Sequence, residues 1–266
     1  MDGSNKYVDD FLNEMDDKIY QQEDDLYNQF EDYFYDFDTD NSRIEQSANN
    51  FSRANKVNDE FSKAFAAYIA GFLIWYGNKV IGVQPFVVSY YNSMGFKAKL
   101  SDVDFLKKQI GIDGSNIIKD SYLWNLGFMG EFRQKVQNYI INSIASAKRF
   151  NAFLRDAKPL FKSTAEQPSS LMNFYRKYAY DTANQMLNVT GNFFADKFGL
   201  NEFLYEGDLI KDSREFCIER CGNTYTREEG ESWNDLQWSG KIPGVDFFIQ
   251  AGGTNCRHLI VWQNNK

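Results

Sequence analysis

The pattern of apolar and polar positions predicts helices over most of the chain. Apolar side chains recur at spacings of three and four, the periodicity of helices with one buried face. The predicted helical segments run from residues 6 to 35, 55 to 80, 132 to 155 and 171 to 199. We expect Pro159 to end the third segment and Gly199 the fourth. Around Pro85, the run "GVQPFVVSYY" predicts a break and a short extended piece.

The pattern changes after Leu200. Short extended runs alternate with glycine-rich turns, and Thr226 and Glu229 have the spacing of a capping box that opens one short helix. The run "RHLIVW" predicts a final strand. The fold class is therefore mainly α with a small C-terminal α+β module of short strands. We divide the chain into an acidic helical arm (1–50), a helical body (51–199) and the module (200–266).

Charge is spread unevenly over the 266 residues. Residues 1 to 47 hold 15 acidic side chains against three basic ones, and the remainder holds 22 against 26, which together give the net charge of −8. The segment from Lys6 to Tyr35 is then an acidic amphipathic helix. Two interpretations stay open: a solvated helix that rests on its own domain, or an arm that docks on a basic partner surface. A nucleic-acid binder needs a basic surface, so direct DNA binding is disfavoured.

Hydropathy and cysteine usage predict the compartment in which the chain folds. The N-terminal sequence is acidic where a secretory signal needs positive charge and an apolar run. The longest uncharged stretch, residues 64 to 78, is shorter than the roughly 18 residues of a membrane span. Three cysteines, all within the last fifty residues, do not form a disulfide framework. We expect folding in a reducing cytoplasm and no membrane partner.

Four characteristic runs follow one another within the module. They are "YEGDLIKDSREFC", "GNTYTREEGESW", a Trp-Ser-Gly-Lys turn beginning at Trp238, and "AGGTNCRH". In this order they resemble the C-terminal signature of tailed-phage head-morphogenesis proteins, the Mu F-like minor head proteins. The resemblance reaches back over "YDTANQMLN" and covers about residues 130 to 262.

The resemblance implies a structural protein without catalytic activity. Such a protein binds at or near the portal vertex of the phage head and supports head assembly and genome packaging or delivery. It belongs to the virion and is assembled in the cytoplasm of the bacterial host, and its partners are the portal or other head proteins. The residues that match the family's structural motif are Asp212, Arg214, Cys217, Gly222, Trp238, Gly252, Gly253, Cys256 and Arg257. The chain departs from the family in its Cys-x-x-x-Cys spacing and its Cys-Arg-His ending.

The three cysteines and the single histidine form a candidate metal site. Cys217 and Cys221 are four residues apart, and Cys256 and His258 alternate on a predicted strand. Three thiols and one imidazole suit a closed tetrahedral zinc site. A disulfide between Cys217 and Cys256, or buried thiols without a metal, are the alternatives. Cysteine catalysis is disfavoured, because no third group is evident that would orient the imidazole.

Two other functions remain as alternatives to a head protein bound at the portal. One is a zinc-containing protein that acts on nucleic acid during packaging or ejection. The other is an internal cargo protein ejected with the genome. For Trp238, core packing and an exposed anchor for a partner are both compatible with a glycine-rich turn.

Overall fold

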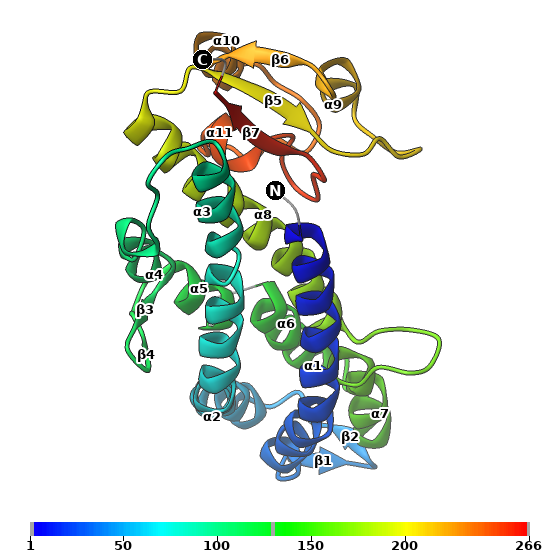
Figure 1. Cartoon of the computed structure of the whole chain (residues 1–266). Helices are drawn as coiled ribbons and strands as arrows, with labels where there is room; N and C mark the ends of the chain where they lie inside the picture. Colours follow the sequence, from blue (N-terminus) through cyan, green and yellow to red (C-terminus); the bar gives the residue numbers. More distant parts are fainter. Residues whose placement is uncertain (1–2, 129–130, 265–266) are drawn as a thin grey trace. The chain divides into compact units, whose positions relative to one another are not determined.

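A computed structural model describes residues 3–128 and 131–264 of the chain, and Figure 1 shows its helices and strands. The long helices are α1 (Ser4–Phe34), α2 (Ala48–Ile81), α6 (Glu131–Ala145), α7 (Phe150–Phe161) and α8 (Ser170–Phe198). The shorter ones are α3 (Gln84–Ser93), α4 (Phe105–Ile110), α5 (Tyr122–Phe128), α9 (Glu215–Arg220), α10 (Arg227–Ser232) and α11 (Phe247–Gln250), with 3-10 turns at Leu100–Asp102 and Trp233–Asp235. The prediction of a mainly helical chain with a small C-terminal α+β module is confirmed.

The strands are short and antiparallel. Two hairpins are formed by β1 (Thr39–Asp40) with β2 (Arg43–Ile44) and by β3 (Ile112–Asp113) with β4 (Asn116–Ile117). A three-stranded sheet in the order β6-β5-β7 is formed by β5 (Glu202–Glu206), β6 (Thr224–Thr226) and β7 (Leu259–Gln263). The final strand and the capping box at Thr226 and Glu229 are both as predicted.

The chain divides into two compact units, each built from stretches that are distant in the sequence. The terminal unit comprises Met1–Leu12, Asn78–Leu106 and Lys177–Lys266. The inserted unit comprises Asn13–Gly77 and Lys107–Arg176. These units cut across the three consecutive segments of the sequence analysis, because both ends of the chain contribute to the terminal unit.

Helix α1 has the amphipathic character expected from its sequence. Most of its apolar side chains are buried, and in the inserted unit the ring of Phe30 packs against those of Phe34, Phe153 and Phe161 at centroid distances of 4.8 to 5.7 Å. Most of its acidic side chains, such as Asp17 and Asp25, are exposed. The helix is therefore part of the core of its own chain, and its outer face carries the negative charge.

Glu23 is a buried carboxylate on α1. It holds the polar connector between α7 and α8, residues 162–169. Its side chain is 3% exposed and accepts hydrogen bonds from the Ser163 backbone N–H, the Ser163 hydroxyl and the Ser169 hydroxyl, each at 2.7 Å. Three donors offset the cost of burying this polar group. The connector is consequently fixed to α1 within the inserted unit.

Four predicted boundaries were wrong, two of them at prolines; one is the start of α2, which lies at Ala48 and not at residue 55. The segment around Pro85 is helix α3, and Pro85 lies in its first turn, where a missing N–H costs nothing. The predicted helix over 132–155 is broken between α6 and α7, where Ala147 adopts a positive φ of 46°. Pro159 lies inside α7, two residues before its end, so only the last turn is affected.

Side chains of α8 and α3 hold the outer edge of β7. Asn188 accepts from the Ile260 N–H and donates to the Ile249 carbonyl, both at 3.1 Å. The Tyr90 hydroxyl donates to the Trp262 carbonyl at 2.7 Å. Because these bonds satisfy backbone groups that an edge strand leaves open, they fix the module to α8 inside the terminal unit.

In the part of the chain that the structure describes, no helix combines the length and the apolar character needed to cross a membrane.

Candidate metal centre

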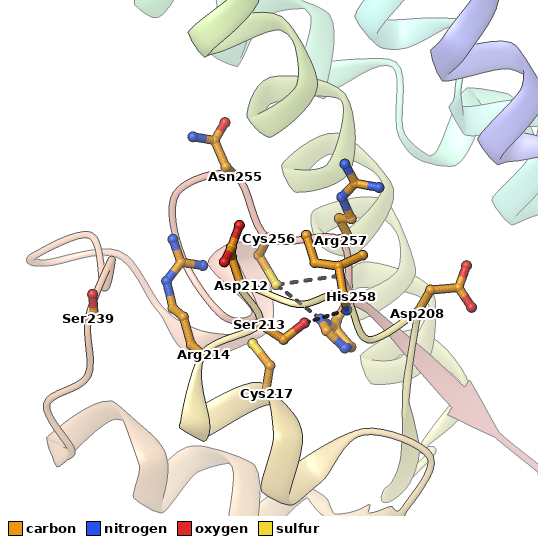
Figure 2. Close-up of a pocket in the computed structure, with 11 residues that line it drawn as sticks. Asp208, Asp212, Ser213, Arg214, Cys217, Ser239, Asn255, Cys256, Arg257 and His258 are labelled. Carbon is orange, nitrogen blue, oxygen red and sulfur yellow. Dashed lines mark hydrogen bonds between the residues drawn. The ribbon is translucent and has the colours of Figure 1, made fainter.

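Three of the four predicted ligands meet at one buried point in the C-terminal module. Cys217 lies on α9, and Cys256 and His258 lie on the segment that leads into β7 (Figure 2). Their ligand atoms all lie within 4.8 Å of one another, and the three side chains are only 3 to 5% exposed. Of the described residues, these three form a group that could hold a metal ion.

Cys221 does not join the other three predicted ligands. It follows the last residue of α9, and its backbone N–H still donates to the Cys217 carbonyl at 2.9 Å. Its thiol donates to the Gly207 carbonyl at 3.0 Å, and its sulfur is not among the ligand atoms that lie within 4.8 Å of one another. The prediction of Cys221 as a ligand placed it at one point with Cys217, Cys256 and His258, and the structure does not bring it there.

The sulfur of Cys256 is surrounded by hydrogen-bond donors. The backbone N–H groups of Gly252 and His258 point at it from 3.2 and 3.4 Å, and His258 Nδ1 lies 3.6 Å away. The pKa of the Cys256 thiol is held well below its ordinary value, first because the Cys217 thiol donates to it and further because His258 and Tyr205 do. The pKa of Cys217 is raised, by its hydrogen bond with Cys256 and by burial. The backbone donors around the Cys256 sulfur favour negative charge on Cys256 over Cys217.

Tyr205 on β5 contacts the whole group. Its hydroxyl lies 3.4 Å from the Cys217 sulfur and 3.7 Å from the Cys256 sulfur, and its ring stacks on the imidazole of His258. Burial raises the pKa of Tyr205, so its hydroxyl stays protonated and acts as a donor to the sulfurs. The sequence analysis missed this residue; the alternation along "FLYEG" opposite the final strand is the signal that could have found it.

Gly252 leaves the space in which the sulfurs meet. A Cβ at this position would lie 2.5 Å from the Cys217 sulfur and 2.7 Å from the Cys256 sulfur. The Gly252 carbonyl in turn accepts from Trp238 Nε1 at 2.9 Å and from the Arg214 guanidinium at 3.4 Å. The glycine thus joins the sulfur pair to two other residues of the motif.

Arg214 and Trp238 both make contacts that hold the module together. Arg214 also donates to the Thr254 carbonyl, and no ion pair with Asp212 occurs in the described chain. Trp238 is half-buried and stacks on Phe216 with centroids 4.1 Å apart and an interplanar angle of 16°. Of the two interpretations of Trp238, core packing describes its contacts.

The remaining motif residues divide into turn glycines and exposed charges. Gly222 and Gly253 have positive φ values of 78° and 92°, a conformation that favours glycine. At Gly253 a Cβ would also lie 2.0 Å from the Gly240 carbonyl oxygen. Asp212 and Arg257 are exposed. The motif therefore consists of residues that shape the module and of two charged residues on its surface.

A cavity of about 390 Å³ opens onto the three ligands. Its walls carry Asp208, Asp212, Ser213, Arg214 and Arg257, and Figure 2 shows these side chains around the sulfurs. The buried Nε2 of His258 has no hydrogen-bond partner within the described residues. Since no acidic group among the described residues bonds to the imidazole, the pair of Cys256 and His258 has no third triad member in that part of the chain.

Helix α8 supports the loop that carries Cys256. Asn184 donates to the Cys256 carbonyl at 3.2 Å, and the Asp181 carboxylate accepts from the Asn255 N–H at 2.6 Å. Burial raises the pKa of Asp181 to about 6. Both residues belong to the run "YDTANQMLN", and through them one face of α8 fixes the cysteine loop.

Comparison of the chain with protein-family models, with curated proteins and with solved structures finds no match.

Proposed function

We propose that this chain is a structural protein of a tailed-phage head, of the Mu F-like minor head type. In this proposal it binds the portal or other head proteins and supports head assembly and genome packaging or delivery. The observation that carries the proposal is the convergence of the motif residues: Arg214 and Trp238 both donate to the carbonyl of Gly252, the glycine that leaves space for the sulfur pair. A motif that builds the interior of a module is typical of a binding scaffold rather than of a catalytic surface.

The exposed charge of α1 suggests how such a protein meets a partner. Residues 1 to 47 carry 15 acidic side chains, and most of those on α1, apart from the buried Glu23, face away from the apolar side. A basic surface on the partner would accelerate encounter with this face more than it would tighten the complex. The association rate should therefore fall as ionic strength rises.

Co-expression with the portal protein of the same phage tests the proposal. We expect the two proteins to co-purify at low salt, and we expect the variant Asp17→Asn/Asp32→Asn to associate more slowly than the wild type. The variant Asp208→Asn/Asp235→Asn, which removes the same charge outside α1, is the matched control. Absence of association at every ionic strength contradicts the proposal. The position of the chain in an assembled particle separates a portal-bound protein from internal cargo.

We propose further that Cys217, Cys256 and His258 hold a structural zinc ion. With Zn–S and Zn–N bonds of about 2.3 and 2.0 Å, a tetrahedral ion separates its sulfur and nitrogen ligands by about 3.5 Å. The distance of 3.6 Å between the Cys256 sulfur and His258 Nδ1 agrees with this value. Backbone N–H groups that point at a thiolate are also typical supports of a metal ligand. A module of this size would gain on the order of 10 kcal/mol of folding free energy from zinc.

Elemental analysis of the purified protein tests the zinc site. We expect one zinc ion per chain in the wild type and in Cys221→Ser, and loss of zinc in Cys217→Ser. Equal zinc content in Cys217→Ser and the wild type contradicts the site. The cavity with Arg214 and Arg257 at its walls favours one alternative, a protein that acts on nucleic acid. Zinc-dependent cleavage of DNA by the purified protein would support that alternative.

A further inference from the structure

The candidate metal centre has three ligands, whereas a structural zinc ion takes four. The three are Cys217, Cys256 and His258, and no fourth histidine, cysteine or carboxylate of the described chain has its ligand atom within 4.8 Å of all of them. Structural zinc sites are almost always closed by a fourth protein ligand. The question is which side chain closes this one.

The nearest polar groups are already engaged. The Cys221 thiol donates to the Gly207 carbonyl. The Ser213 hydroxyl accepts from the Ile210 N–H at 2.8 Å. The Tyr205 hydroxyl lies at hydrogen-bond distance from both sulfurs, 3.4 Å from that of Cys217 and 3.7 Å from that of Cys256. Each of these groups would have to give up a bond in order to bind the ion.

Two carboxylates, Asp208 and Asp212, line the cavity above the ligands. Neither makes a hydrogen bond or ion pair in the described chain, and zinc accepts carboxylate oxygen at about 2.0 to 2.2 Å. In Figure 2 the Asp208 carboxylate points away from Cys217 and Cys256, whereas Asp212 lies on their side. Asp212 is therefore the better placed of the two.

The backbone around Asp212 is fixed close to the ligands. Ser213 N–H donates to the Ile210 carbonyl at 2.9 Å and closes a tight turn that has Asp212 inside it. Two residues later, Arg214 is anchored to the Gly252 and Thr254 carbonyls. Asp212 lines the same cavity as the three ligands, and its exposed side chain is free of packing that would hold it in one rotamer.

We propose that Asp212 is the fourth ligand of the ion, which makes the site Cys217, Cys256, His258 and Asp212. This inference rests on the proposed zinc site. It also gives a function to a motif residue that pairs with no other side chain in the described chain. An oxygen ligand from an exposed loop would cover the ion at the mouth of the cavity.

Cobalt(II) binding to the metal-free full-length chain tests the inference. Cobalt reports its coordination through its d–d absorption, and its thiolate ligands through charge-transfer absorption in the near ultraviolet. We expect Asp212→Asn to weaken cobalt binding at least about tenfold, the lower end of the loss seen when a supporting partner of a ligand is removed. The d–d spectrum should change, while the thiolate absorption persists. Asp208→Asn, which removes a carboxylate from the same cavity, should bind and absorb like the wild type.

The outcomes separate this inference from the zinc proposal. If the wild type binds cobalt and Asp212→Asn has the same affinity and spectrum, the assignment of Asp212 is overturned and the zinc site stands. The same conclusion follows if Asp208→Asn changes the spectrum as much as Asp212→Asn does. A wild-type chain that takes up no cobalt and no zinc overturns both. Circular dichroism of each variant shows that the fold is retained, as expected for substitutions of exposed side chains.

Discussion

The ring of Tyr205 lies flat against the imidazole of His258, with centroids 4.9 Å apart and an interplanar angle of 8°. The hydroxyl of the same tyrosine reaches the sulfurs of Cys217 and Cys256. One side chain of β5 therefore contacts all three candidate ligands, which come from two separate segments of the module. It orients the histidine through its ring and supplies a hydrogen bond to the thiolates through its hydroxyl.

Removing only this hydroxyl should weaken metal binding without unfolding the module. In Tyr205→Phe the stacked ring remains, but the sulfurs lose a donor that stabilises their negative charge. We expect zinc affinity to fall by about 10- to 100-fold, measured by competition with a chromophoric chelator. Tyr225→Phe is the control, because its hydroxyl bonds only to the Glu219 carbonyl, at 3.5 Å. Equal affinities in the two variants would show that the hydroxyl does not support the ligands.

A methyl group at Gly252 should destabilise the module. The added carbon would lie within 2.9 Å of both sulfurs and of the Tyr205 hydroxyl, all buried groups that cannot easily move. Overpacking of this kind costs about 1 to 3 kcal/mol. Urea unfolding of Gly252→Ala, compared with Gly191→Ala, measures the effect. At Gly191 the nearest atoms lie 3.9 Å from the added carbon, so that variant should be at least as stable as the wild type.

Asn188 should be more important for stability than a typical helix asparagine. Its side chain is 2% exposed and satisfies one backbone N–H and one backbone carbonyl. Asn188→Leu leaves both buried groups without a partner, at about 1 to 3 kcal/mol for each. We expect a clear loss in unfolding free energy, whereas Asn138→Leu on the exposed face of α6 should change little. A small effect at Asn188 would indicate that other groups satisfy the edge of β7.

Asp181 predicts a pH dependence of stability. Its pKa is about 6 in the folded chain, raised by burial from an ordinary 3.8, so the folded state binds the proton more tightly than the unfolded state. This contribution to stability is fully present below pH 3.8 and is lost as the pH rises through 6. At pH 7 the ionised carboxylate therefore lowers the free energy of unfolding.

The variant Asp181→Asn tests this dependence. Its amide oxygen can still accept from the Asn255 N–H, but it does not ionise. We expect the variant to be more stable than the wild type at pH 7 by about 1 kcal/mol, a value reduced for partial solvent screening. The difference should shrink or reverse near pH 4. Urea titrations of metal-free protein at several pH values measure it, and a difference that stays constant with pH would contradict the assignment.

Much of the helical architecture could be predicted because it depends on local periodicity. The apolar spacing on α1 and α8 placed both helices to within two residues. Pro85 and Pro159 were misjudged for a related reason: a proline is compatible with the first turn of a helix and tolerable near its end, and sequence alone does not show which turn it occupies.

The sequence predicted which kinds of ligand form the candidate metal centre, but only some of the residues that belong to it. Counting thiols and imidazoles identified Cys217, Cys256 and His258, which are brought together by the pairing of β5 with β7. Cys221 is left out because its thiol bonds to the Gly207 carbonyl, and Tyr205 is included because of tertiary pairing. The alternation along "FLYEG" indicates that Tyr205 points inward, but not which side chains it meets there.

The interleaving of the two units has a consequence for biosynthesis. The terminal unit needs residues from both ends of the described chain, whereas the inserted unit is complete once Arg176 has been made. On a translating ribosome the inserted unit can therefore close first, while residues 3 to 12 wait for the last ninety to emerge. During that interval the start of α1 has only the part of its final cover that residues 78–106 supply, where Tyr7 packs on Phe86 and donates to the Lys79 carbonyl. The terminal unit therefore completes its core only after the inserted unit has closed.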